Sequence, residues 1–184
     1  MDDDLTGRLL IAGPPIMDPN FTRTVVLVCE HGDSGALGLV INRVTDIPLA
    51  DHLPSWLDAV APPPLVFAGG PVAPQVAVGL AHFAPDATPG SFTAILPGIG
   101  LIDLSAGPPA PGALRRIRVF AGYAGWSAGQ LEAELAEPGA WFVADARPDD
   151  PFTEEPGGLR RAVLRRQAGT LRLLEHYPPS PRLN

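Results

Sequence analysis

The sequence predicts an α+β fold, with strands and helices interspersed along a chain of 184 residues. Short apolar segments that are rich in β-branched residues and bounded by Gly, Pro, Asn or Asp predict the strands. Fewer segments show the helical spacing of apolar residues. A hydrophobic content of 46% and a charged content of 18% suit an ordinary core, so we expect a single domain that covers residues 1–184.

The first predicted strands lie in the N-terminal quarter of the chain. Residues 7–12 form the first strand, which ends where Gly13-Pro14-Pro15 removes two backbone donors. Residues 24–30 are almost continuously apolar, which is typical of a central strand that is buried on both faces. A hairpin loop is expected at 31–35, and a returning strand at 37–42.

Helices and further strands follow in the rest of the chain. Apolar residues at helical spacing predict a helix over 49–60, which Pro54 shortens or kinks. Ser127 and Gln130 have the spacing of a capping box and predict the start of a second helix. A basic helix is expected at 159–167. Further strands are expected at 65–68, 75–81, 99–104, 116–123 and 141–144.

The start of the chain and its hydropathy bear on location. The first residues are Met1-Asp2-Asp3-Asp4, unlike the basic and then apolar start of a signal peptide. No apolar run reaches the roughly 18 residues needed to cross a bilayer. We therefore expect a cytoplasmic protein with no membrane contact. Cys29 is the only cysteine, so the chain can form neither an internal disulfide nor a thiolate metal cluster.

Charge and composition disfavour nucleic-acid and nucleotide sites. The net charge of -7 argues against nucleic-acid binding by the whole surface, because phosphate contacts need clustered positive charge. Acidic residues at 145–155 are expected to neutralise the single candidate patch. That patch comprises Arg160, Arg161, Arg165, Arg166 and Arg172. The chain has no lysine and no G-x-G-x-x-G segment, which excludes the Walker A and Rossmann sites, and we predict no cofactor.

Four segments together resemble the YqgE/AlgH family of bacterial proteins. They are residues 7–12 with 18–26, residues 30–43, residues 66–72, and residues 122–132, which begin Gly122-Tyr123-Ala124-Gly125-Trp126. The resemblance implies curved mixed or antiparallel sheets that form a partial barrel with flanking helices. The family usually has proline after Asn-Arg, whereas this chain has Val44, which affects only a turn. One member is named for an effect on transcription of alginate genes, and the family has no settled molecular activity.

Polar residues at predicted strand ends and turns form the main candidate site. They are Asp18, Arg23, His31, Asn42 and Arg43, and Tyr123 and Trp126 complete the set. A shared pocket of these residues could bind a small anion or a peptide, because arginine holds carboxylate or phosphate in a fork. The alternative is a set of turn caps and ion pairs, since turns favour Asp and Asn on their own account.

Gly125-Trp126-Ser127-Ala128-Gly129 matches the G-x-S-x-G pattern of a serine hydrolase, between a predicted strand and a predicted helix. Acidic residues and then His176 follow in the order that such a triad requires. Three observations count against the hydrolase. A helix cap already explains Ser127, His176 lies in a Pro-rich tail, and the family pattern does not demand serine there.

Cys29 and His31 would share one face of an extended strand. Burial of this strand would make the thiol inert, which favours a structural cysteine over a nucleophilic one. Glu30, His31 and Asp33 lack the spacing of a known metal site. We therefore predict a regulatory or binding module rather than an enzyme, whose partner is an unidentified protein or a small anionic ligand.

Overall fold

A ten-stranded sheet dominates the computed structural model, which describes residues 4–87, 90 and 92–177. The strands are β1 (Arg8–Ala12), β2 (Val25–Gly32), β3 (Gly35–Val40), β4 (Val44–Pro48), β5 (Leu65–Ala68), β6 (Val72–Phe83), β7 (Phe92–Leu96), β8 (Ile99–Ile102), β9 (Leu114–Ser127) and β10 (Trp141–Asp145). Their main order is β10-β1-β2-β3-β9-β6-β8-β7, and β5 joins β4 to β9. All pairs are antiparallel except β5 with β9.

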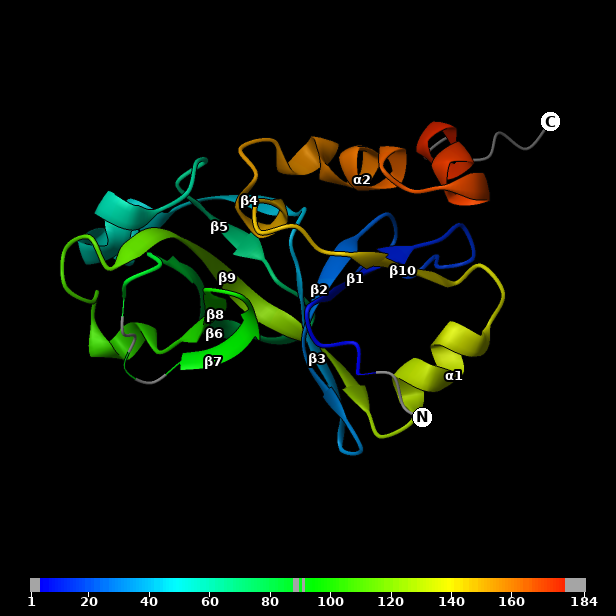
Figure 1. Ribbon diagram of the computed structural model, residues 1–184, viewed down its shortest axis with the longest axis horizontal. Coiled ribbons are helices and arrows are strands. Elements are labelled where there is room, and N and C mark those ends of the chain that lie inside the picture. Colours follow the sequence, from blue (N-terminus) through cyan, green and yellow to red (C-terminus); the bar gives the residue numbers. More distant parts are fainter. Residues whose placement is uncertain (1–3, 88–89, 91, 178–184) are drawn as a thin grey trace.

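The 14-residue strand β9 connects the two halves of the sheet. Its C-terminal part pairs with β3, while its N-terminal part pairs with β6 and β5. Around this long strand the sheet curls into a half-barrel, which Figure 1 shows in the arrangement of β6, β7, β8 and β9. The predicted α+β fold with curved, mainly antiparallel sheets is therefore confirmed.

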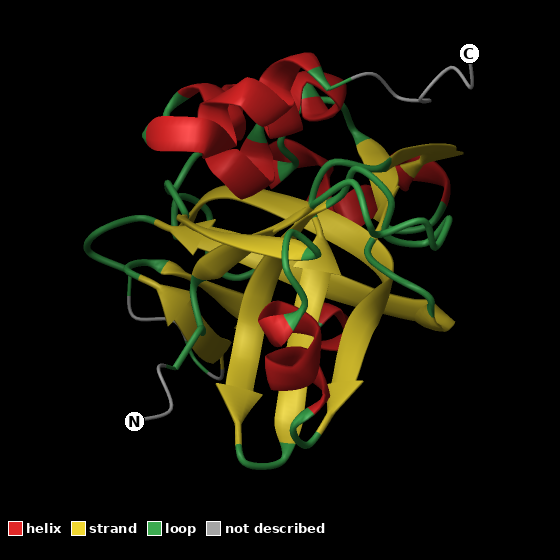
Figure 2. Ribbon diagram, turned by 90° about the vertical axis from the view of Figure 1, so that its right-hand side faces the viewer, coloured by secondary structure: helices red, strands yellow, loops and turns green. Residues whose placement is uncertain are grey.

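Helices cover both faces of β1, β2 and β3. The regular helices are α1 (Gln130–Ala136) and α2 (Pro156–Arg165), and the 3-10 helices are η1 (Leu49–Asp51), η2 (Pro54–Ala59), η3 (Leu104–Ala106), η4 (Asp150–Phe152) and η5 (Gly169–His176). Alternate strand residues such as Leu27 and Val28 belong to two different hydrophobic clusters. Leu159 of α2 belongs to the first cluster and Leu131 of α1 to the second. Figure 2 shows α2 and η5 above the sheet.

Burial on both faces explains why residues 24–30 are apolar throughout. Every residue from Val25 to Cys29 has at most 1% of its surface exposed. The prediction of a central strand is therefore confirmed. The hairpin loop is shorter than predicted, because β2 continues to Gly32 and β3 begins at Gly35.

The predicted helix over 49–60 is wrong. The segment forms η1 and η2 instead, and Pro54 stands at the start of η2, where its missing N–H breaks no helical hydrogen bond. Leu49 and Trp56 are buried, so the apolar spacing reflects packing of two short turns rather than one helix. The strands β4 and β7 and the 3-10 helix η5 were not predicted.

The Gly69-Gly70 pair serves a close approach of two backbones rather than an ordinary tight turn. A Cβ atom on Gly69 would lie 2.3 Å from the carbonyl oxygen of Gly122. A Cβ atom on Gly122, which has a φ of +71°, would lie 2.6 Å from the carbonyl oxygen of Gly70. Any other residue at Gly69 or Gly122 would therefore push the end of β5 away from β9.

Candidate functional site

A cavity with a polar lining lies where four distant segments meet. It has a volume of about 710 Å³ and opens between the turn before β2, the residues after β3, the first turns of α2 and the end of η5. Its lining comprises Thr22, Arg23, Asn42, Arg43, Gly157, Gly158, Arg160, Arg161, Glu175, His176 and Tyr177. We refer to it as the arginine cavity.

Asn42 and Arg43 fix one wall of the arginine cavity by binding the turn before β2. The Asn42 amide accepts a hydrogen bond from the Val25 N–H at 2.9 Å and donates one to the Arg23 carbonyl at 3.1 Å. The Arg43 guanidinium donates to the carbonyls of Asn20 at 2.7 Å and Thr22 at 2.9 Å. Burial lowers the pKa of Arg43, and nearby Asp18 counteracts this.

Arg23 stands in a strained backbone conformation at the cavity. Its φ of +60° lies in the left-handed region, which costs a residue with a side chain about 1 kcal/mol or more. Its guanidinium reaches across the cavity and donates to the Tyr177 carbonyl at 3.2 Å. The sequence thus keeps a long cationic side chain at a position where glycine would be less strained.

Arg160 is the most unusual residue of the lining because it is a buried charge. Only 6% of its surface is exposed, and Nη2 donates to the Ala12 carbonyl at 3.2 Å. Its buried Nε has no hydrogen-bond partner. Burial lowers the pKa of Arg160, and the like charge of Arg23 adds to this effect.

Positive charge in the arginine cavity exceeds negative charge. Glu175 is the only acid in the lining, and it is already held by Arg161 at 2.8 Å and Arg165 at 2.5 Å. None of Arg23, Arg43 and Arg160 forms an ion pair with any residue in the described part of the chain. The cavity can therefore accept an anion through several guanidinium groups.

The structure brings together three of the seven residues predicted for the binding pocket: Arg23, Asn42 and Arg43. The other four lie elsewhere. Asp18 caps its own turn by accepting from the Asn20 N–H at 2.8 Å, and it lines a separate cavity of about 280 Å³. Tyr123 packs against the hydrophobic core.

His31 and Trp126 line a third cavity, of about 320 Å³. Nδ1 of His31 accepts a hydrogen bond from the Leu5 N–H at 3.2 Å. Nε2 of His31 lies 2.8 Å from a carboxylate oxygen of Glu132. These partners fix the tautomer that carries its proton on Nε2. The Trp126 indole donates to Glu134 at 3.0 Å, so both side chains already have partners.

Sequence reasoning missed the contribution of α2 to this site. The sequence places Arg160 in the candidate nucleic-acid patch, yet in the structure it lies on the apolar stripe of the helix together with Leu159, Val163 and Leu164. Arg160 precedes the apolar Val163 by three positions and Leu164 by four. This helical spacing could have indicated that Arg160 faces inward. Glu175 and Tyr177 carry no such signal, because η5 itself was not predicted.

Ser127 does not adopt the geometry of a catalytic triad. Its hydroxyl and its N–H both contact Oε1 of Gln130, at 3.2 and 3.0 Å. It forms no hydrogen bond with any histidine of the described residues, and His176 lines the arginine cavity instead. The predicted helix cap at Ser127 is wrong, because Ser127 ends β9 and the N-cap of α1 is Gly129, with no side-chain cap. Of the capping box, only the contact from Gln130 back to the Ser127 N–H is present.

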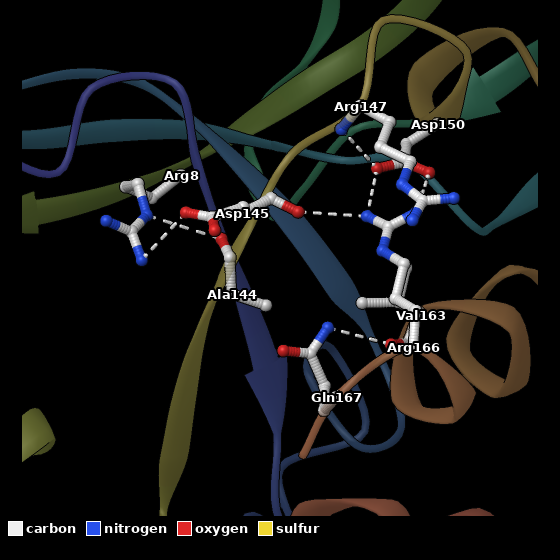
Figure 3. Close-up of polar contacts among 8 residues, drawn as sticks. All are labelled: Arg8, Ala144, Asp145, Arg147, Asp150, Val163, Arg166 and Gln167. Carbon is white, nitrogen blue, oxygen red and sulfur yellow. Dashed lines mark hydrogen bonds and ion pairs between the residues drawn. The ribbon is translucent and has the colours of Figure 1, made fainter.

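Three arginines of the predicted nucleic-acid patch, Arg161, Arg165 and Arg166, form ion pairs within the described part of the chain. Figure 3 shows Arg166 donating to both carboxylate oxygens of Asp150, at 2.8 and 2.5 Å, and to the Asp145 carbonyl at 2.9 Å. Arg161 and Arg165 share Glu175, and Arg160 is buried. The arrangement therefore leaves little free positive charge for a phosphate backbone.

Cys29 is expected to be unreactive in the folded protein. It sits at the bulge of β2 with 1% of its surface exposed, and burial raises the pKa of its thiol above the usual range. We expect no reaction with a disulfide reagent such as DTNB in buffer and one thiol per chain in denaturant. Rapid labelling of the native protein would contradict this structural role. No group of three or more potential metal ligands occurs in residues 4–87, 90 and 92–177.

No helix in the described part of the chain is both long and apolar enough to cross a membrane. A family model described as AlgH-like matches residues 9–172. A UPF0301 protein of Streptomyces coelicolor is 47% identical over 98% of this chain and 95% of its own length. A UPF0301 protein of Thermobifida fusca is 42% identical over 98% and 96%.

Two solved structures have similar folds. The crystal structure of protein DIP2367 from Corynebacterium diphtheriae has a TM-score of 0.85 with 29% identity, over 95% of this chain and 93% of that one. The solution structure of the AlgH protein from Pseudomonas aeruginosa has a TM-score of 0.70 with 33% identity, over 96% and 95%.

Proposed function

This chain belongs to the AlgH-like family, and we propose that it is a cytoplasmic binding module in which the arginine cavity holds an anionic ligand. The observation that carries this proposal is the state of Arg160. A buried guanidinium without a carboxylate is costly, because the charge loses its hydration and gains only one backbone acceptor. An anion in the cavity would offset that cost.

The strain at Arg23 supports the same conclusion. A non-glycine residue in the left-handed region persists where the surrounding structure enforces that conformation, and such residues cluster at functional sites. Here the side chain contributes a second cation to the cavity that Arg160 lines. Two unfavourable features, a strained backbone and an unpaired buried charge, thus meet at one place.

A regulatory role is part of the proposal. The cavity joins segments that are far apart in sequence, from Thr22 to Tyr177. An anion there would tie η5 and α2 to the turn before β2, so binding would alter the surface that a protein partner meets. An effect on transcription would pass through such a partner rather than direct DNA contact, since the net charge is -7.

Replacing Arg23 with glutamine is expected to weaken anion binding at least tenfold, because one of the three guanidinium groups that form no ion pair is lost. Isothermal titration of the full chain with phosphate and with citrate measures this at constant ionic strength. Arg172→Gln is the matched control, since Arg172 is exposed on η5 and does not line the cavity. Equal affinity of Arg23→Gln and wild type for both anions would sink the proposal.

A further inference from the structure

The first turn of α2 opens onto the arginine cavity. This helix has ten residues, and Gly157 and Gly158 line the cavity near its N-terminus. Pro156 has no N–H, Glu155 at the N-cap offers no side-chain cap, and the Gly157 N–H has no acceptor among the described residues. A free backbone donor and the positive end of the helix dipole thus face the cavity.

Arg160 provides an independent observation at the same place. It follows Gly157 by one turn, is 94% buried in the protein, and lines the same cavity with Nε unpartnered. Arginine carries five N–H donors. Arg160 forms one hydrogen bond within the described part of the chain, from Nη2 to the Ala12 carbonyl. The helix N-terminus and the guanidinium therefore offer donors to one ligand group.

The donors approach the cavity from different directions. Arg23 comes from the turn before β2, Arg43 from the residues after β3, and Arg160 from α2. A carboxylate presents two oxygens in one plane and a single charge. A phosphate monoester presents three terminal oxygens in a tetrahedral array and a charge of about −1.5 to −2, which suits donors that converge from several sides.

Space around the glycine pair also suits a phosphoryl group. Gly157 is exposed, and a Cβ atom added to it would meet nothing within 4 Å, so the backbone here is open to a ligand. The volume of about 710 Å³ far exceeds that of a phosphate ion and lies within the range of small-molecule sites. The cavity therefore has room for an organic body in addition to the anionic group.

We infer that the arginine cavity is a site for a phosphorylated small organic molecule, whose phosphoryl group lies between the N-terminus of α2 and the guanidinium groups of Arg160 and Arg23. This inference rests on the proposed function and specifies its ligand class. It narrows the partner predicted from the sequence, which was an unidentified protein or a small anionic ligand.

A matched pair of probes separates the two claims. Glucose 6-phosphate and glucuronate share a sugar body and differ in the group at carbon 6, and citrate controls for multiple negative charges. Isothermal titration of the full chain is expected to give at least tenfold tighter binding of glucose 6-phosphate than of either carboxylate. Tighter binding of citrate or glucuronate would overturn the phosphoryl inference and leave the proposed anion site intact. No binding of any of the three anions would overturn both.

A pair of charge variants tests the location. Gly157→Glu places a carboxylate at the helix N-terminus, where it favours the fold but repels the ligand. Ala162→Glu makes the same charge change on an exposed position of α2 that does not line the cavity. We expect glucose 6-phosphate to bind Gly157→Glu more than tenfold more weakly than wild type, and its affinity for Ala162→Glu to change less than twofold. Thermal unfolding curves check that both variants are folded. Equal effects of the two substitutions would overturn the assigned position.

Discussion

Replacement of Arg118 with alanine is expected to destabilise the fold by about 3 kcal/mol or more, because three backbone carbonyls lose their donor and a buried cavity forms. The guanidinium donates to Thr153 at 2.9 Å, Ala61 at 3.1 Å and Pro62 at 2.6 Å. It also stacks 4.1 Å above the ring centroid of Phe67.

Arg118 is almost completely buried on β9 and has no carboxylate partner in the described residues. Burial lowers the pKa of its guanidinium to about 10, and the charge of Arg116 contributes, so the group still carries its charge at neutral pH. The carbonyls and the aromatic ring therefore offset a considerable desolvation cost. Through Thr153, Arg118 also fixes the segment that leads into α2.

Urea unfolding of Arg118→Ala and Arg115→Ala measures this effect. Arg115 lies on the same strand but is exposed, so its replacement should change the free energy of unfolding by only about 0.5 kcal/mol or less. Equal stability of both variants would mean that the contacts of Arg118 contribute nothing net. Because α2 lines the arginine cavity, we also expect Arg118→Ala to weaken anion binding.

Asp150→Ala is expected to cost about 3 kcal/mol, because Arg166 would remain largely buried without its bidentate partner. The side chains of Arg166 and Asp150 are only 15% and 7% exposed. Asp150 also accepts the Arg147 N–H at 2.7 Å, so it holds the segment between β10 and α2. Figure 3 shows this network beside the pair of Arg8 and Asp145.

Asp145→Ala is the matched control for Asp150→Ala. Arg8 and Asp145 lie 3.2 Å apart, but their side chains are 43% and 90% exposed, and such surface pairs contribute about 1 kcal/mol at most. The Asp145 carbonyl that binds Arg166 is kept in this variant. A larger loss of unfolding free energy for Asp145→Ala than for Asp150→Ala would contradict the account of the buried network.

Strands with a strong apolar pattern were predictable from the sequence, and exposed edge strands were not. β2 could be recognised because both of its faces are buried. β4 is mostly exposed, contains Asp46 and Pro48, and pairs only with β5, so neither alternation nor β propensity marks it. The resemblance to the YqgE/AlgH family, which the comparisons confirm, supplied the curvature that periodicity could not.

The candidate site was predictable in part for a related reason. The paired strands β2 and β3 bring three of the residues together. Arg23 precedes β2, and Asn42 and Arg43 follow β3, so the sequence already places them at one edge. Arg160 is more than 100 positions further along the chain, and only tertiary packing of α2 against the sheet brings it to the same cavity. The burial that leaves its charge unpaired is likewise a property of the folded chain.

The most direct test of the arginine cavity is the position of a heavy tetrahedral anion in a crystal. Crystals of the full chain soaked in tungstate would locate the anion by its anomalous scattering. We expect a peak in the cavity, within hydrogen-bond reach of the Arg160 guanidinium and the Gly157 N–H. An empty cavity in crystals that bind tungstate elsewhere on the protein would contradict it.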